Sequence, residues 1–165
     1  FAPHAQLFGM KLRLLAAGTR MPAWVEAGFS DYRNRMPREC QLELREIPLS
    51  RHRRSGDVKR AVGEEGERMI RALAPSDVVV ALDVHGILMD TAGLAERLDG
   101  WLHGGSDVAF LIGGPDGLDP RCRQMSRLSW SLSPLTLPHA LARIVVAEQL
   151  YRAWSILKGH PYHRE

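Results

Sequence analysis

Residues 77–83 read Asp-Val-Val-Val-Ala-Leu-Asp, and residues 107–112 read Asp-Val-Ala-Phe-Leu-Ile. In each stretch five consecutive apolar residues follow an aspartate. Strands that are apolar at every position, and not only at alternate ones, are typical of a parallel sheet covered by helices on both faces. These two stretches therefore predict an α/β fold.

Strand and helix patterns alternate on both sides of these two stretches. Further strands are predicted over residues 11–16 and 41–47, the second with polar residues at alternate positions. The apolar periodicity predicts helices over residues 22–35, 58–73, 91–103, 120–128 and 139–157. No long linker or internal repeat interrupts this pattern, so we expect a single domain over residues 10–165. Residues 1–9 are expected to be a cloning remnant or a natural extension outside the fold.

Several local signals refine the boundaries of these elements. Asp57 is expected to cap the helix that begins at residue 58, and Thr91 the helix that follows it along the chain. Gly86 is expected to end the strand that begins at residue 77, because glycine weakens a strand interior.

Composition limits the classes of protein to which the chain can belong. It has 165 residues, enough for one domain with a substantial core, and its 22 basic and 19 acidic residues leave a net charge of +3. Its two cysteines, Cys40 and Cys122, lie far apart and are expected to be free thiols in a reducing compartment. No apolar run approaches the roughly 20 residues of a membrane span. We therefore expect a cytoplasmic protein without a membrane partner.

Three loops are candidates for ligand binding at the edge of the sheet where its strands end. They comprise residues 82–86, the glycine-rich turn 112–117 and residues 133–138. Open α/β sheets bind ligands at the carboxyl ends of their strands. The turn, Gly-Gly-Pro-Asp-Gly, matches neither the dinucleotide-binding fingerprint nor the P-loop. On composition alone an ordinary turn is the better explanation, because glycine turns are common.

Two charged segments lie outside these loops. Residues 51–54, Arg-His-Arg-Arg, suit phosphate contacts, although a solvated loop is the commoner explanation of such a run. The tail, residues 160–165, contains two histidines three positions apart but no third ligand nearby, so we expect no metal site there. Terminal residues seldom support a core, and deletion of residues 162–165 is expected to leave the fold nearly intact.

Taken together, these motifs resemble one protein family. The stretches that carry the resemblance are FLIGGPDGL at 110–118, WSLSPLTLPH at 130–139, EQLYRA at 148–153, HPYHRE at 160–165, MKL at 10–12, AGT at 17–19 and EEGERM at 64–69. They resemble the large-subunit ribosomal RNA pseudouridine N3-methyltransferases of the SPOUT, or trefoil-knot, class. The resemblance extends over residues 10–165.

The resemblance implies properties that the residue pattern alone does not predict. It implies a C-terminal trefoil knot, a homodimer, S-adenosylmethionine as cofactor and a pseudouridine of 23S ribosomal RNA, in the large subunit or the assembled ribosome, as methyl acceptor. By position, the cofactor contacts would be Leu82, Gly114, Ser133, Pro134, Leu135, Thr136, Leu137 and Pro138. Gly114 is expected to admit the cofactor because glycine allows close backbone approach, so Gly114→Val should abolish binding without unfolding. Tyr151 and Trp154 are expected to anchor the dimer.

Transfer of a methyl group to N3 requires loss of the N3 proton, and a histidine is the natural acceptor. His139 and His163 are both candidates, while Arg164 and Tyr162 are expected to hold the RNA or to stack on the base. His139 is equally explained as a helix-start residue with a structural hydrogen bond. Two alternative functions remain: a non-catalytic RNA-binding or ribosome-assembly module, and a nucleotide-binding enzyme with a different chemistry at the same loops.

Overall fold

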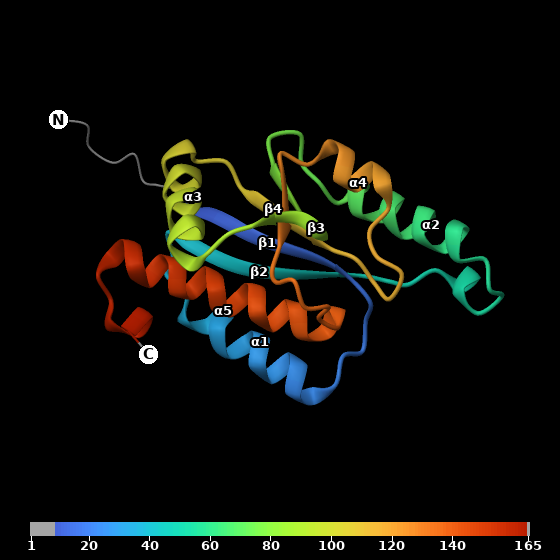
Figure 1. Ribbon diagram of the computed structural model, residues 1–165, viewed down its shortest axis with the longest axis horizontal. Helices are drawn as coiled ribbons and strands as arrows, with labels where there is room; N and C mark the ends of the chain where they lie inside the picture. Colours follow the sequence, from blue (N-terminus) through green and yellow to red (C-terminus); the bar gives the residue numbers. More distant parts are fainter. Residues whose placement is uncertain (1–8, 165) are drawn as a thin grey trace.

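The computed structural model describes residues 9–164, so residues 1–8 of the expected extension lie outside the described part of the chain. Within it, five parallel strands form one sheet in the order β2-β1-β4-β3-β5 (Figure 1). The strands are β1 Met10–Ala17, β2 Cys40–Ile47, β3 Val78–Leu88, β4 Val108–Ile112 and β5 Leu128–Ser131. The predicted α/β class and parallel sheet are confirmed.

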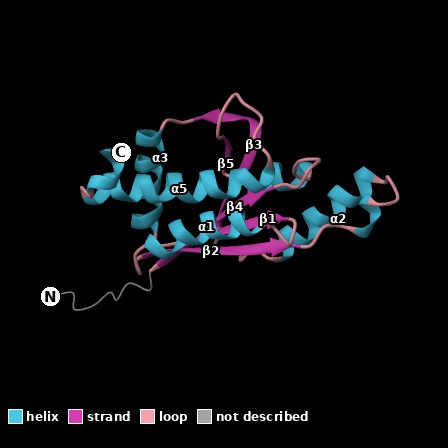
Figure 2. Ribbon diagram, turned by 90° about the horizontal axis from the view of Figure 1, so that it is seen from below, coloured by secondary structure: helices cyan, strands magenta, loops and turns pink. Residues whose placement is uncertain are grey.

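Helices cover both faces of the sheet (Figures 1 and 2). One face carries α1 Ala23–Arg35, α3 Thr91–Gly104 and α5 His139–Lys158, and the other carries α2 Val58–Arg71 and α4 Pro120–Met125. Two short 3₁₀ turns, η1 Arg51–Arg53 and η2 Pro161–Arg164, follow β2 and α5. Among the described residues, no helix is both long and apolar enough to cross a membrane.

The central strands explain this two-sided arrangement. In β4, Val108, Phe110 and Ile112 belong to the core under α1, α3 and α5. Ala109 and Leu111, which alternate with them, belong to the core under α2 and α4. Since successive side chains of a strand point to opposite faces, a continuous apolar run supplies both cores at once.

The end of β3 differs from the sequence expectation. The strand passes through Gly86 and continues to Leu88, with a register shift against β5 between Leu82 and Ile87. A Cβ atom at Gly86 would lie only 2.6 Å from the backbone carbonyl of Ser129 in β5. The glycine therefore does not end the strand; it allows close approach to its neighbour at an irregularity of the sheet.

Other boundaries are confirmed or corrected by side-chain contacts. Asp57 accepts a hydrogen bond from the Arg60 amide, as predicted for an N-cap. The cap of α3 is Asp90 and not Thr91, because the Asp90 carboxylate accepts from the Gly93 amide. The helix predicted to reach residue 128 ends at Met125, and residue 128 begins β5. A strand of four residues is too short to show a periodicity of its own.

Candidate active site

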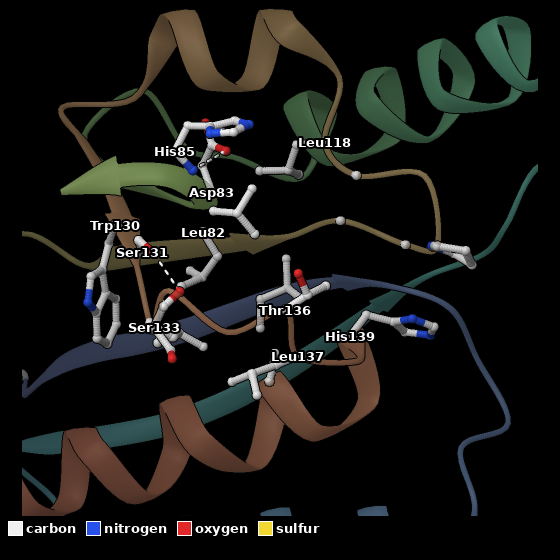
Figure 3. Close-up of a pocket in the computed structure, with 18 of the residues that line it drawn as sticks. Leu82, Asp83, His85, Leu118, Trp130, Ser131, Ser133, Thr136, Leu137 and His139 are labelled. Carbon is white, nitrogen blue, oxygen red and sulfur yellow. Dashed lines mark hydrogen bonds between the residues drawn. The ribbon is translucent and has the colours of Figure 1, made fainter. Parts of the chain in front are cut away.

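A pocket of about 410 Å³ opens at the carboxyl ends of β3, β4 and β5 (Figure 3). Its walls come from the three loops expected to bind a ligand, together with Arg123 of α4 and the start of α5. Parallel strands end at the same edge of their sheet, which brings these loops together although they are far apart in sequence. The volume and the largely apolar lining suit a small organic ligand.

Most of the predicted cofactor residues meet in this pocket. Those that line it are Leu82, Gly114, Ser133, Leu135, Thr136 and Leu137. Pro134 and Pro138 are not among its lining residues. Pro138 instead precedes α5, where its carbonyl accepts a hydrogen bond from the Ala142 amide at 2.9 Å. Its contribution is therefore to the start of the helix that carries His139.

The loop between β5 and α5 is shaped by its own serines. The Ser131 hydroxyl donates to the Ser133 carbonyl at 3.1 Å, and the Ser133 hydroxyl accepts from the Leu135 amide at 2.9 Å. Such side-chain to backbone bonds hold a loop that has no regular structure. Leu135, which is 71% exposed, is left as an apolar group at the pocket.

The opposite wall is the glycine-rich turn. Gly114 and Gly117 pair as an isolated antiparallel bridge, with the Gly117 amide donating to the Gly114 carbonyl at 3.0 Å. Gly117 has a φ of +85°, a conformation that residues other than glycine rarely adopt. The turn thus presents closely packed backbone to the pocket.

A charged pair that sequence reasoning does not identify also lines the pocket. Arg123 of α4 lies 3.5 Å from Asp83, and the other carboxylate oxygen of Asp83 accepts from the His85 amide (Figure 3). The signal available in the sequence is the aspartate that closes the apolar stretch 77–83. Its partner lies 40 positions away, and nothing in the sequence marks it.

His139 is the first residue of α5 and lines the pocket. Partial burial lowers the pKa of its imidazole, and the positive charges of Arg143 and Arg53 lower it further. The positive end of a helix dipole acts in the same direction. The neutral imidazole, which can accept a proton, is therefore the favoured form at neutral pH.

Beneath His139 lies Arg143, a fully buried side chain that sequence patterns do not single out. Its guanidinium donates to the Glu46 carboxylate at 2.7 Å and to the Gly18 carbonyl at 2.8 Å. These bonds join the ends of β1 and β2 to the first turn of α5. A buried arginine whose donors are largely satisfied in this way is costly to remove, and it fixes the helix that carries His139.

The tail residues do not meet His139 within one chain. Helix α5 has 20 residues and is therefore about 30 Å long, and η2 follows its far end (Figure 1). Tyr162 is 9% exposed, and its ring centre lies 4.7 Å from that of Tyr151 and 4.9 Å from the Arg152 guanidinium. The ring is already packed within the chain, which differs from the expected free ring that stacks on a base.

The same packing changes two other expectations. Tyr151, expected to anchor a dimer, is 6% exposed because Trp154 and Tyr162 cover it. Tyr162 is itself buried against Tyr151, so we now expect a deletion that includes Tyr162 to uncover Tyr151 and to lower the stability of the fold. His163 and Arg164 lie at the end of the described chain, and Glu165 lies outside it.

Comparison with known proteins places these observations in a family context. A family model described as "Predicted SPOUT methyltransferase" matches residues 10–163. A protein of Thioalkalivibrio sulfidiphilus named "Ribosomal RNA large subunit methyltransferase H" is 53% identical over 94% of this chain and 100% of its own length. A protein of the same name from Alkalilimnicola ehrlichii is 55% identical over 94% of this chain and 99% of its own length.

Solved structures support the fold. A probable methyltransferase from Bordetella pertussis superposes with a TM-score of 0.54 at 18% identity, covering 90% of this chain and 96% of that one. A probable methylase family protein from Haemophilus influenzae superposes with a TM-score of 0.55 at 12% identity, covering 94% and 70%. At these identities the likeness concerns the fold alone.

Proposed function

This chain belongs to the SPOUT methyltransferase family, and from that premise we propose that it transfers a methyl group from S-adenosylmethionine to N3 of a pseudouridine in large-subunit ribosomal RNA. Relatives named ribosomal RNA large subunit methyltransferases match almost the whole chain at 53% and 55% identity. A cytoplasmic site of action, on the large subunit or the assembled ribosome, belongs to the same proposal. So does the trefoil knot that the family resemblance implies.

The observation that carries the proposal is the pocket itself. Six of the eight residues that the resemblance assigns to the cofactor line one cavity, of about 410 Å³, and His139 lies at its wall. Leucine side chains supply apolar walls for an adenine ring, while the glycine-rich turn supplies backbone groups. Asp83 and Asp116 also line the pocket, and each is paired with an arginine, so these carboxylates are held in place at its wall.

When bound, S-adenosylmethionine supplies a methyl group on a positively charged sulfur. The chain's residues then have two tasks: to hold the acceptor nitrogen in line with that methyl group, and to accept the N3 proton. His139 suits the second task because it lines the pocket and because its lowered pKa keeps the imidazole in the neutral form, which can accept a proton. The proton of N3 would pass to the imidazole, and the electron pair of the broken N3–H bond would form the new bond to the methyl carbon. The carbon–sulfur bond of the bound cofactor would break at the same time, and its electron pair would neutralise the sulfur.

We expect the activity to depend on pH through His139. Because its pKa lies below the usual value of about 6.5, the neutral, proton-accepting form persists to mildly acidic pH. The rate should therefore be constant near neutrality and fall only as the pH drops through that lowered pKa. His139→Gln should lower kcat by about 10²-fold or more and remove the acidic limb of the pH profile. An unchanged acidic limb in this variant would assign the proton acceptor to another group, such as His163.

The placement of the tail supports a homodimer. His163 and Arg164 lie about one α5 length, roughly 30 Å, from the pocket of their own chain, so any role in transfer requires the pocket of a second copy. Trp24, which is 59% exposed on α1, supplies uncovered apolar surface. The small pocket lined by Val25 and Arg143 places this turn of α1 beside the first turns of α5. We propose a symmetric dimer in which each tail completes the partner's site.

The protein should sediment at twice 18.5 kDa at micromolar concentration. Trp24→Glu, which places a charge on the exposed apolar surface of α1, should shift this equilibrium toward monomer. Analytical ultracentrifugation of both forms measures the effect, with Val58→Glu, another exposed apolar position, as control. A wild-type mass near 18.5 kDa would contradict the dimer.

Only two of the three arginines in the basic loop 51–54 are placed to contact phosphates. Arg51 and Arg54 are exposed, whereas Arg53 points inward to carboxylates. We expect the double variant Arg51→Gln and Arg54→Gln to weaken RNA binding and to reduce its salt dependence, because counterion release scales with the number of phosphate contacts. Filter binding at several salt concentrations measures both quantities. Equal salt slopes for variant and wild type would remove this loop from the RNA surface.

The function is tested by transfer of a labelled methyl group. The protein is incubated with methyl-labelled S-adenosylmethionine and with ribosomes, isolated large subunits or free ribosomal RNA, each prepared with and without the pseudouridines. We expect label at N3 of a pseudouridine, and none in RNA that carries uridine instead. RNA binding without measurable affinity for S-adenosylmethionine would favour a non-catalytic RNA-binding module.

A further inference from the structure

Glu65 is a nearly buried carboxylate on α2, outside the cofactor pocket. It is 3% exposed, and its Oε2 accepts from the Ser50 amide at 2.9 Å and from Arg53 Nε at 2.9 Å. A second Arg53 nitrogen, Nη2, also contacts it, so the pair is bidentate. Such a pair fixes the plane of the guanidinium as well as its distance.

The remaining branch of Arg53 reaches the cofactor pocket. Its Nη1 contacts the carboxylate of Asp116, which lies at the tip of the glycine-rich turn and lines the pocket. Its Nη2 lies 3.4 Å from the position of a Cβ atom on Gly114 in the same turn. All three guanidinium nitrogens of Arg53 therefore contact carboxylates, and this arginine does not serve the RNA surface as its neighbours do.

We infer that Arg53 is a positioning residue, which holds the glycine-rich turn at the separation that the cofactor requires. Glu65 orients Arg53 from α2, and Arg53 orients Asp116 at the pocket. The bridge between Gly114 and Gly117 lies within the turn, whereas Arg53 connects the turn to η1 and α2. This inference rests on the proposed function, because it assumes that S-adenosylmethionine binds in the pocket.

Arg53 also connects the basic loop 51–54 with the cofactor pocket. Arg53 lies between the exposed Arg51 and Arg54 on one short loop, and it touches the turn that lines the cofactor pocket. A phosphate contact that shifts this loop would move Arg53 and thereby Asp116. RNA binding and cofactor binding should therefore affect each other, and the effect must be reciprocal if it operates at equilibrium.

Calorimetry with S-adenosylmethionine on the full chain tests the inference. Arg53→Gln should weaken cofactor binding by about 10-fold to 100-fold, the cost of a small displacement at a positioned site. Arg53→Lys should restore it only in part, because an ammonium group cannot contact both carboxylates in the same planar geometry. The matched control is Arg71→Gln, which removes an arginine of α2 paired with Glu67 at 3.4 Å, away from the pocket.

A second variant allows for loss of folding, because Arg53→Gln leaves Glu65 buried without its partner. Asp116→Asn keeps the Arg53–Glu65 pair and should weaken cofactor binding to a similar extent. The double variant, Arg53→Gln with Asp116→Asn, should bind the cofactor no more weakly than either single variant. Both substitutions remove the same interaction, that between Arg53 and Asp116. In steady state the KM for S-adenosylmethionine should rise while kcat at saturation changes by no more than about 3-fold, as expected when binding is lost equally in ground and transition states.

The outcomes separate the two proposals. If the wild-type protein shows no affinity for S-adenosylmethionine, the proposed function fails. If it binds and both Arg53→Gln and Asp116→Asn, folded by circular dichroism, bind as well as Arg71→Gln does, the function stands and the positioning role is overturned.

Discussion

Replacing Gly113 by alanine should lower the affinity for S-adenosylmethionine by at least about 100-fold. A Cβ atom at this position would lie 2.5 Å from the carbonyl carbon of Gly117 and 2.6 Å from the amide nitrogen of Leu118. These are backbone atoms of the same turn, so no change of side-chain rotamer relieves the overlap. The turn has to open, and the pocket wall that it forms moves with it. Calorimetry of the folded variant measures the effect.

Gly114→Ala is the matched control. The three atoms nearest to its Cβ atom would all belong to side chains, those of Leu49 at 3.3 Å, Arg53 at 3.4 Å and Ala17 at 3.5 Å. We expect less than about a 10-fold loss of affinity, because side chains can yield by a few tenths of an ångström. Gly114→Val should be worse than alanine, because its extra methyl groups press on Leu49 and Arg53. Similar affinities for the alanine variants at 113 and 114 would contradict this account of the turn.

Removing residues 163–165 should abolish methyl transfer while leaving cofactor binding within about 2-fold of wild type. The deletion removes the second candidate proton acceptor, His163, and Arg164, but retains the buried Tyr162. We expect the rate of transfer to fall by about 10²-fold or more. The target pseudouridine would lose groups that position it and one candidate acceptor for its N3 proton. The measurement is single-turnover transfer of a labelled methyl group to ribosomes.

Tyr162→Ala separates the structural part of the tail from its functional part. Its ring contacts Tyr151 and Arg152, and its hydroxyl lies 3.4 Å from that of Tyr32. Loss of a buried aromatic ring should cost about 3 kcal/mol of unfolding free energy, as read from urea denaturation. A truncated protein lacking 163–165 that methylates ribosomes at the full rate would restrict the tail to this packing role.

Much of the fold is predictable because it depends on local patterns. Continuous apolar runs in residues 77–83 and 107–112 indicate strands buried on both sides, and both are central in the sheet. The parallel arrangement follows from the helices between them, and it places three distant loops at one edge. The position of the pocket and most of its lining therefore follow from local patterns in the sequence.

Elements without a local pattern are missed or misplaced by sequence reasoning. The four residues of β5 are not predicted as a strand, and the first of them, Leu128, is assigned to the predicted helix 120–128. Gly86 wrongly predicts the end of β3, which continues beside β5. In both cases the deciding contacts are with a neighbouring strand. The trefoil knot that the family resemblance implies would be a property of how the chain is threaded, and neither periodicity nor spacing indicates it.

Local patterns suffice for the fold class, the parallel sheet and the edge at which the ligand loops meet, because apolar periodicity acts over short ranges of the chain. The order of the strands and the roles of single side chains depend instead on contacts between distant residues. Arg53 belongs to a basic run that is typical of a solvated loop, yet it contacts Asp116, 63 positions away. Tyr162 lies close to the end of the chain, yet it packs against Tyr32, 130 positions away. Partners at such separations come together only when the chain has folded, so no motif records them.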